Sequence, residues 1–174
     1  MKESATIHDI MTRVSVRQFT DAPVSDSDIE TILRAGMAAP SAMNKQPWQF
    51  YVITNDALRR KLSENFSNAV YASSAPLLIV PCADLSKTIE GEGEAYWQQD
   101  LAAATENILL AAHALGLGAV WCGIYPISER VARIRPILDL PDTLIPFGII
   151  CIGHTESAPA PKDKWNPEAL HFIR

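Results

Sequence analysis

The sequence predicts one three-layer domain in which helices cover both faces of a central β-sheet. Short apolar runs that are typical of strands alternate along the chain with longer helical patterns, and strands separated by helices form a sheet that is covered on both sides. The 174 residues are enough for one well-buried domain and too few for two. A hydrophobic content of 48% and a charged content of 20% are typical of a globular protein.

Composition argues against several classes of function. The formal net charge of -5 gives no support for nucleic-acid binding. No run of about eighteen apolar residues is present, so we expect no membrane span. The first residues are too polar for a signal-peptide core, and Cys82, Cys122 and Cys151 lie in apolar runs, which predicts reduced core thiols in a cytoplasmic protein. None of them has the spacing of metal ligands, so we expect no metal site.

The first segment with chemical character is Arg13–Phe19. Arg13, Ser15 and Arg17 alternate with two valines, so an extended chain places the three polar side chains on one face. Two guanidinium groups and a hydroxyl on one face suit a phosphate. The alternative is a solvated edge strand with two surface arginines. No glycine-rich loop accompanies the segment, so it is not a P-loop.

A helix is predicted to begin after Ser25 and to end before Pro40. Ser25 and Asp28 have the spacing of an N-cap and the acidic member of a capping box. Proline stops further growth of the helix. Apolar residues at helical spacing predict a core-packed face, made of Ile29, Ile32, Leu33 and Met37.

The stretch from Ala39 to Trp48 follows this helix and precedes a strand. Its two prolines make it irregular, and a hydroxyl, two amides and an ammonium group lie between them. Irregular polar backbone between two apolar elements is where a scaffold often carries a ligand site. An ordinary helix-to-strand loop remains the alternative interpretation.

The rest of the chain alternates between strand and helix patterns. The predicted elements are a strand at 48–54, a polar helix at 56–68, a strand at 76–84, a helix at 96–115, a strand at 118–126, a helix at 128–135 and a strand at 145–153. The acidic loop 86–94 is expected to be mobile, and its glycines do not form a dinucleotide fingerprint.

Two of these elements have further implications. Apolar residues cover nearly the whole circumference of the 96–115 helix, so it is central to the domain or lies at a dimer interface. Gly123 interrupts an apolar strand, which weakens the strand unless another group approaches its backbone closely. The tail 157–174 is proline-rich and polar, but Trp165, Leu170 and Phe172 suggest that it docks on a surface, such as that of a second subunit.

Four segments together resemble the FMN-dependent nitroreductase family, in particular its short, single-domain members. They are Arg13–Phe19, Ala39–Trp48, Ala114–Trp121 and Pro161–Glu168. The resemblance covers essentially the whole chain, 1–174, in the same order. It implies an α+β fold, a three-layer α/β/α sandwich with a mostly antiparallel sheet. It also implies an obligate homodimer with FMN at the subunit interface.

The resemblance further implies a set of FMN-binding residues. Arg13 and Ser15 would bind the phosphate, with help from Lys162 and Lys164, and Arg17 would reach the pyrimidine edge near N1 and O2. The 40–44 segment would come from the other subunit, and 122–124 would lie against the ring with a backbone N–H near N5 and O4. The expected contacts are Arg13, Val14, Ser15, Arg17, Pro40, Ser41, Ala42, Asn44, Cys122, Gly123, Ile124, Lys162 and Lys164.

The function implied is NAD(P)H-dependent reduction of a small electrophile by a ping-pong mechanism. NAD(P)H would pass a hydride to flavin N5 and leave, and a nitroaromatic, quinone or similar acceptor would take the electrons. The flavin carries the chemistry, so no side chain is expected to be a catalytic residue. The alternatives are a specialised branch, for reductive dehalogenation or flavin fragmentation, and a non-catalytic flavin-binding or storage protein.

Two departures from the family pattern bear on the flavin. Lys164 stands where the short members often carry arginine, and lysine lacks the guanidinium fork. The 62–74 segment has no lysine, whereas some relatives place one near the flavin from this region. Arg17 is therefore the one clear cation that the sequence places at the pyrimidine edge.

Overall fold

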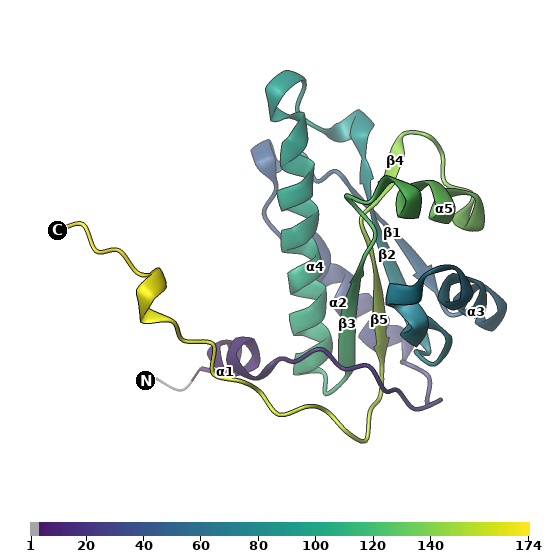
Figure 1. Cartoon of the computed structure of the whole chain (residues 1–174), viewed down its shortest axis with the longest axis horizontal. Helices are drawn as coiled ribbons and strands as arrows, with labels where there is room; N and C mark the ends of the chain where they lie inside the picture. Colours follow the sequence, from purple (N-terminus) through teal and green to yellow (C-terminus); the bar gives the residue numbers. More distant parts are fainter. Residues whose placement is uncertain (1–3) are drawn as a thin grey trace.

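A computed structural model describes residues 4–174 of the chain, apart from the side chain of Glu92. It has three layers, with the sheet between two groups of helices (Figure 1). The sheet has the strand order β1-β2-β5-β3, and β4 pairs with β2 beside β5. Every strand pair is antiparallel. The strands are β1 (Trp48–Ile53), β2 (Leu77–Asp84), β3 (Gly118–Gly123), β4 (Leu144–Pro146) and β5 (Gly148–Gly153). The predicted fold class is confirmed.

The last predicted strand, 145–153, is in fact two strands, so that prediction was wrong. Cys82 pairs with Pro146 in β4, whereas Ile79 pairs with Ile150 in β5. Between these two pairs, the two β2 residues 80–81 lie opposite the three residues 147–149. One extra residue in one strand is a β-bulge, which locally breaks the ladder. Phe147 lies in this bulge and donates its N–H to Pro81 O at 2.8 Å.

Helices α2 (Asp26–Met37) and α4 (Trp97–Ala114) cover one face of the sheet. Ser25 Oγ accepts the Asp28 N–H, which confirms the predicted N-cap. The Asp28 carboxylate accepts from the Ser25 hydroxyl, not from its backbone N–H as in a full capping box. Ile32 and Ile108 are fully buried between this helical layer and the sheet. Met37 was predicted to pack in the core, but half of its surface is exposed, so its position at the C-terminal end of α2 is not part of the core.

Helices α3 (Asp56–Asn65) and α5 (Ser128–Leu138) cover the other face, together with the 3-10 segment η2 (Ser67–Ser73). The predicted helix end before Pro136 was wrong, since α5 continues for two residues beyond it. A proline lacks only its own N–H bond to the preceding turn. The N–H groups of Asp139 and Leu140 both bond to Arg135 O and close the final turn.

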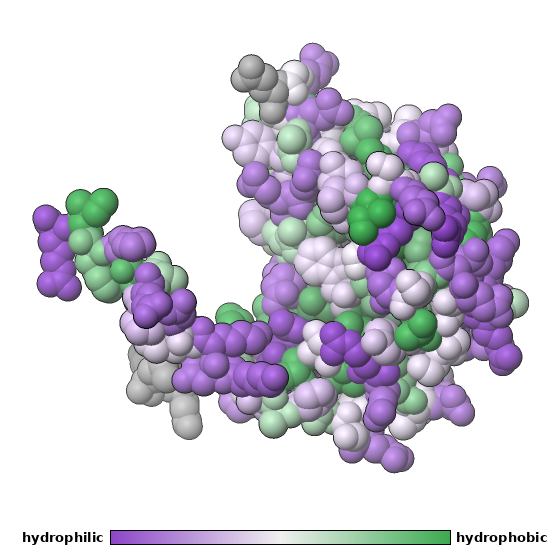
Figure 2. Space-filling model, in the orientation of Figure 1, coloured by the Kyte–Doolittle hydropathy of each residue, from purple (hydrophilic) through white to green (hydrophobic). Residues whose placement is uncertain are grey.

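The remaining segments lie at the margins of this body. Helix α1 (Ala5–Thr12), which the sequence analysis did not predict, packs beside α4. The 86–94 loop forms two short 3-10 turns, η3 (Leu85–Lys87) and η4 (Gly91–Tyr96), and η1 (Ala42–Asn44) and η5 (Pro167–Ala169) are similar turns. Residues 156–174 are exposed and extend away from the body (Figures 1 and 2). Among residues 4–174, no helix has both the length and the apolar character that a membrane span requires.

The three cysteines are buried, and none forms a disulfide. Cys82, Cys122 and Cys151 all lie in the layer between the sheet and α3 and α5. Burial raises the pKa of the Cys82 thiol to about 12. The prediction that the three cysteines are core residues is confirmed. The described part of the chain holds no cluster of His, Cys, Asp and Glu side chains that could bind a metal.

Candidate cofactor site

A cavity of about 540 Å³ lies between the segment after α1 and the C-terminal tail. The predicted phosphate-binding side chains all line it, and they come from segments about 150 residues apart in sequence. These are Arg13, Ser15, Arg17, Lys162 and Lys164. Val14 also lines the cavity. Four cations and a hydroxyl around one open space favour an anionic ligand.

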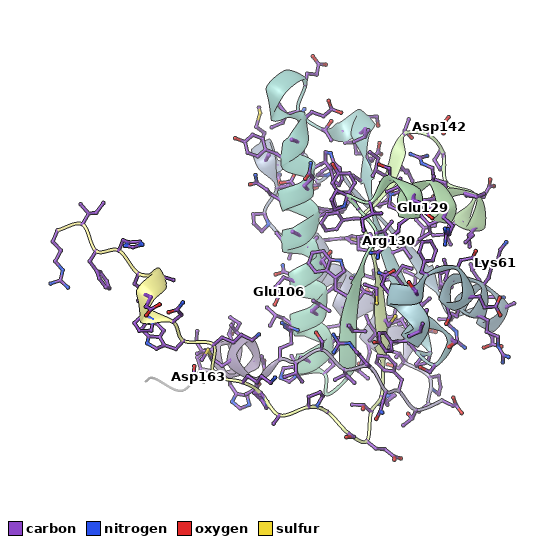
Figure 3. The ribbon with its side chains drawn as sticks, in the orientation of Figure 1. Lys61, Glu106, Glu129, Arg130, Asp142 and Asp163 are labelled. Carbon is purple, nitrogen blue, oxygen red and sulfur yellow. The ribbon has the colours of Figure 1, made fainter. Side chains whose placement is uncertain are left out.

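Arg13 is held in place by α4. Its Nε lies 3.2 Å from Glu106 Oε1, and no group in residues 4–174 forms a hydrogen bond with this Nε, so the contact is electrostatic. The neighbouring Thr12 Oγ1 lies 2.9 Å from His113 Nε2. Glu106 and His113 are two turns apart on α4 and therefore lie on the same face. Figure 3 labels Glu106 on this helix and Asp163 on the tail where the tail passes α1.

The segment after Arg13 contacts the outer edge of β3 at Ala119 and then passes the end of β5. Val16 N–H donates to Ala119 O at 2.9 Å, and Ser15 forms an isolated parallel bridge with Ala119. Along a strand, successive residues direct their backbone groups to alternate edges. Gly123, four residues after Ala119, therefore directs its N–H and C=O to the same outer edge, away from β5.

Two side chains hold the outer edge of β3 at Gly123. Asn68 Nδ2 and Arg130 Nη1 each donate to Gly123 O at 2.9 Å. A Cβ added at Gly123 would meet no atom within 4 Å. By contrast, a Cβ at Gly148, the residue paired with it on β5, would lie 2.4 Å from Trp121 Nε1. The backbone at Gly123 is thus fixed, and the space beside it is open.

Arg17 lies between the cavity and this strand edge. Its guanidinium carbon is 5.8 Å from the centre of the Tyr71 ring, within range of a cation–π contact. A hydrogen bond with the Cys151 thiol, helped by the nearby Arg17 and Arg130 guanidinium groups, lowers the pKa of Cys122. Arg130 is therefore a second cation close to the strand, which the sequence analysis did not identify.

These contacts define an axis along β3. Ser15 marks one end through its bridge to Ala119, and Gly123 marks the other, about 13 Å away at about 3.3 Å per residue. The side chains of Cys122 and Ile124 are buried in the core on the α3–α5 side. The backbone of Cys122 faces β5, and the Ile124 N–H donates to Phe147 O at 3.2 Å. Of the three residues expected to lie against the flavin, Gly123 is therefore the one that directs its backbone groups to the outer edge.

The predicted residues at 40–44 do not line this cavity. Figure 1 shows η1 and β3 on opposite sides of the N-terminal half of α4. Ala42 N–H donates to Asp100 Oδ1 at 2.8 Å, and Ser41 Oγ accepts the Gln46 N–H. Met43 is 78% exposed, and Asn44 is also exposed. Within one chain the predicted site residues therefore fall into two separate groups.

Several residues that build this arrangement were missed from sequence. Asp100 and Glu106 are the two acidic residues of the largely apolar helix α4, and that contrast was the available signal. Asn68 and Arg130 lie in the predicted helical segments 56–68 and 128–135, but nothing in those patterns indicates a contact with Gly123, and only the fold brings them to it.

Comparison with known proteins identifies the family. The model of the nitroreductase family matches residues 10–89 and 72–154, which together span most of the chain. This chain belongs to the nitroreductase family. The resemblance found in the sequence is thereby confirmed.

Relatives of this nitroreductase-family chain match nearly all of it. A protein of Archaeoglobus fulgidus, provisionally named NADH dehydrogenase/NAD(P)H nitroreductase, is 42% identical over 167 residues, covering 93% of this chain and 94% of that protein. A nitroreductase-like protein of Desulfovibrio desulfuricans, solved in complex with FMN, has a TM-score of 0.87, 32% identity and 99% coverage of both chains. The NADPH:FMN oxidoreductase of Vibrio harveyi, complexed with NAD+, has a TM-score of 0.87, 27% identity, and coverage of 98% of this chain and 78% of that one.

Proposed function

We propose that this protein is an NAD(P)H-dependent flavin oxidoreductase that binds FMN and reduces small electrophiles such as nitroaromatics and quinones. The observation that carries the proposal is the axis along β3, with a cationic cavity at one end and an open, fixed glycine backbone at the other. FMN has an anionic phosphate at one end and a planar ring at the other, so the donor groups of this axis fit it. Relatives of this chain are named as FMN and NAD(P)H enzymes.

The phosphate end would be held by Arg13, Ser15, Lys162 and Lys164. Glu106 engages Nε of Arg13, which leaves the two terminal guanidinium nitrogens for a bidentate contact with phosphate. The Ser15 hydroxyl supplies a short, neutral donor. The two lysines act as point charges, because they have no planar fork.

The ring end would be held by backbone and by Arg17. Gly123 N–H points to the outer edge, where it can donate to N5 and O4 of the ring. Arg17 can stabilise negative charge at the pyrimidine edge. When bound, FMN supplies the redox chemistry, taking a hydride from NAD(P)H and then passing electrons to an acceptor in the same pocket. The residues of the chain bind the cofactor, orient it and adjust its charge.

A second subunit would complete each site. The 40–44 segment of one subunit would line the ring and ribityl chain bound to the other, which accounts for the separation of the two groups of residues within one chain. A homodimer would also cover the half-buried positions of α4, including Ala102, Ala103 and Leu110. The exposed tail, with Trp165 at 71% and Phe172 at 76% exposed, would dock across the dimer.

An absorbance experiment tests the proposed function. The purified protein is expected to show the spectrum of oxidised flavin, and the visible absorbance should bleach on anaerobic addition of NADPH or NADH. Adding a nitroaromatic or a quinone should restore it. A flavin that stays oxidised in the presence of both nicotinamides would overturn the enzyme assignment and support the storage alternative. A colourless protein that does not take up added FMN would overturn flavin binding altogether.

A further inference from the structure

Asp100 is a polar exception on the buried side of α4. Its exposed fraction is 7%, and its neighbours on this side include Trp97, Leu101 and Ala104. No ion pair found in residues 4–174 includes Asp100. A buried carboxylate is costly unless hydrogen bonds satisfy it. The first turn of α4 favours its negative charge, but does not explain its burial.

The partner of this carboxylate is the backbone of the 40–44 segment. Ala42 N–H donates to Asp100 Oδ1 at 2.8 Å across 58 residues of sequence. This is a charge-assisted hydrogen bond, which is stronger than a neutral one. The segment is thus tied to α4 by the side chain of one residue.

The tied segment is strained. Met43, Asn44 and Gln46 have φ values of 50°, 54° and 49°, a region that residues other than glycine seldom occupy. Three such residues in four positions persist only where surrounding contacts impose them. Side-chain acceptors supply two of these contacts, the Ala42–Asp100 bond and the bond from Gln46 N–H to Ser41 Oγ. Backbone bonds from Asn44 N–H to Ser41 O and from Lys45 N–H to Ala42 O add to them, and the bond to Asp100 links this turn to α4.

The same helix also holds the phosphate end of the site, but at a different place. Glu106, which engages Arg13, is about 9 Å further along α4 than Asp100 and about 120° away around it. Asp100 therefore shapes a segment on the side of α4 away from the Arg13 cavity of its own chain.

We propose that Asp100 is a positioning residue for the FMN site of the partner subunit. Its carboxylate holds the strained Pro40–Asn44 segment in the shape that the other subunit's site receives. This inference rests on the proposed function, because it concerns an FMN site shared by two subunits. Through Asp100 and Glu106, α4 supports one half of its own site and one half of the partner's.

Single substitutions test the contact itself. Asp100→Ala removes the acceptor of the Ala42 N–H, and we expect the FMN dissociation constant of the reconstituted apoprotein to rise about tenfold or more. Asp100→Asn keeps an oxygen acceptor and should restore affinity to within about threefold of the parent.

Asp84→Ala is the matched control: Asp84 is also buried, but it bonds to Ser86, outside both groups of site residues. It should leave the FMN affinity unchanged. Amide exchange at 41–46 should accelerate in the Asp100→Ala variant alone.

Mixed dimers test the action across subunits. Two differently tagged chains, one with Asp100→Ala and one with Arg13→Ala, are co-expressed, purified through both tags and titrated with FMN as apoprotein. If Asp100 serves the partner's site, both defects fall on one site, and each mixed dimer keeps one site of parental affinity. If Asp100 serves its own site or is only structural, no site of parental affinity remains, and the proposal is overturned. Parental dimers that take up no FMN would overturn the proposed function instead, so the two failures are distinguishable.

Discussion

The Arg13–Arg17 segment and the Pro40–Asn44 segment differ in how far one chain completes them. The first segment lies against β3 through the Val16–Ala119 bond and forms one wall of a cavity. The second is strained, carries exposed Met43 and Asn44, and lines no part of that cavity. The Arg13–Arg17 segment therefore forms part of a binding site within its own chain. The Pro40–Asn44 segment has a fixed, exposed conformation that suits contact with another molecule.

This difference teaches that a chain can prepare binding groups that it does not use itself. Strain of the kind seen at Met43 costs stability, and it is found where the surrounding structure imposes it for function. The helix α4 links the two segments, with Asp100 at one and Glu106 at the other.

The largest effect is expected at the phosphate end. Arg13→Ala removes a guanidinium group and leaves the Glu106 carboxylate beside the cavity without its partner. The dissociation constant for FMN should rise by about 10- to 100-fold, as for the loss of a hydrogen bond to a charged group. Titration of the apoprotein with FMN measures it. Arg34→Ala, which breaks an exposed pair with Glu30, is the control. Equal affinities in the two variants would remove Arg13 from the site.

An intermediate effect is expected at the ring end. Gly123→Val should fold normally, because a Cβ there meets no atom within 4 Å, whereas Gly148→Val should lower the melting temperature through its clash with Trp121. Reduction of bound FMN by NADPH should slow about tenfold or more in the Gly123 variant, since small displacements of reacting groups have large effects on rate. Stopped-flow absorbance beside a melting curve measures both. A normal rate of reduction would mean that the open space at Gly123 serves no cofactor.

The smallest effect is expected at Arg17. The Arg17→Ala variant should retain FMN almost as well as the parent, because the phosphate contacts are unchanged. Its flavin reduction potential should fall by about 20 to 40 mV, which corresponds to the loss of roughly 1 to 2 kcal/mol of charge stabilisation in a two-electron couple. Potentiometry on the variant and the parent decides it. An unchanged potential with a large loss of affinity would assign Arg17 to the phosphate instead.

Local patterns predicted much of the fold. The N-cap at Ser25 correctly indicated the start of α2, because a cap depends only on neighbouring residues. The bulge at Phe147 was not predicted, since it arises from the register between two distant strands. The continuation of α5 past Pro136 was missed because bonds from Asp139 and Leu140 compensate for it.

The candidate site was predicted only where a residue type itself suggests a ligand. Arg13, Ser15 and Arg17 stand out as donors on one face of an extended segment, and the structure brings them to one cavity. Asn68 and Arg130 act through the backbone oxygen of Gly123, a role that depends entirely on the tertiary structure. Such positioning residues leave no periodic signal in the sequence.

Sedimentation of the FMN-loaded protein tests the central claim that two chains build each site. Detection at a visible wavelength, where only the flavin absorbs, follows the species that carries the cofactor. At micromolar concentration the coloured species should sediment as a dimer with two FMN molecules, and dilution that separates the subunits should release the cofactor. A monodisperse, coloured monomer that keeps its FMN on dilution would contradict the account, because the Pro40–Asn44 segment would then have no second subunit to serve.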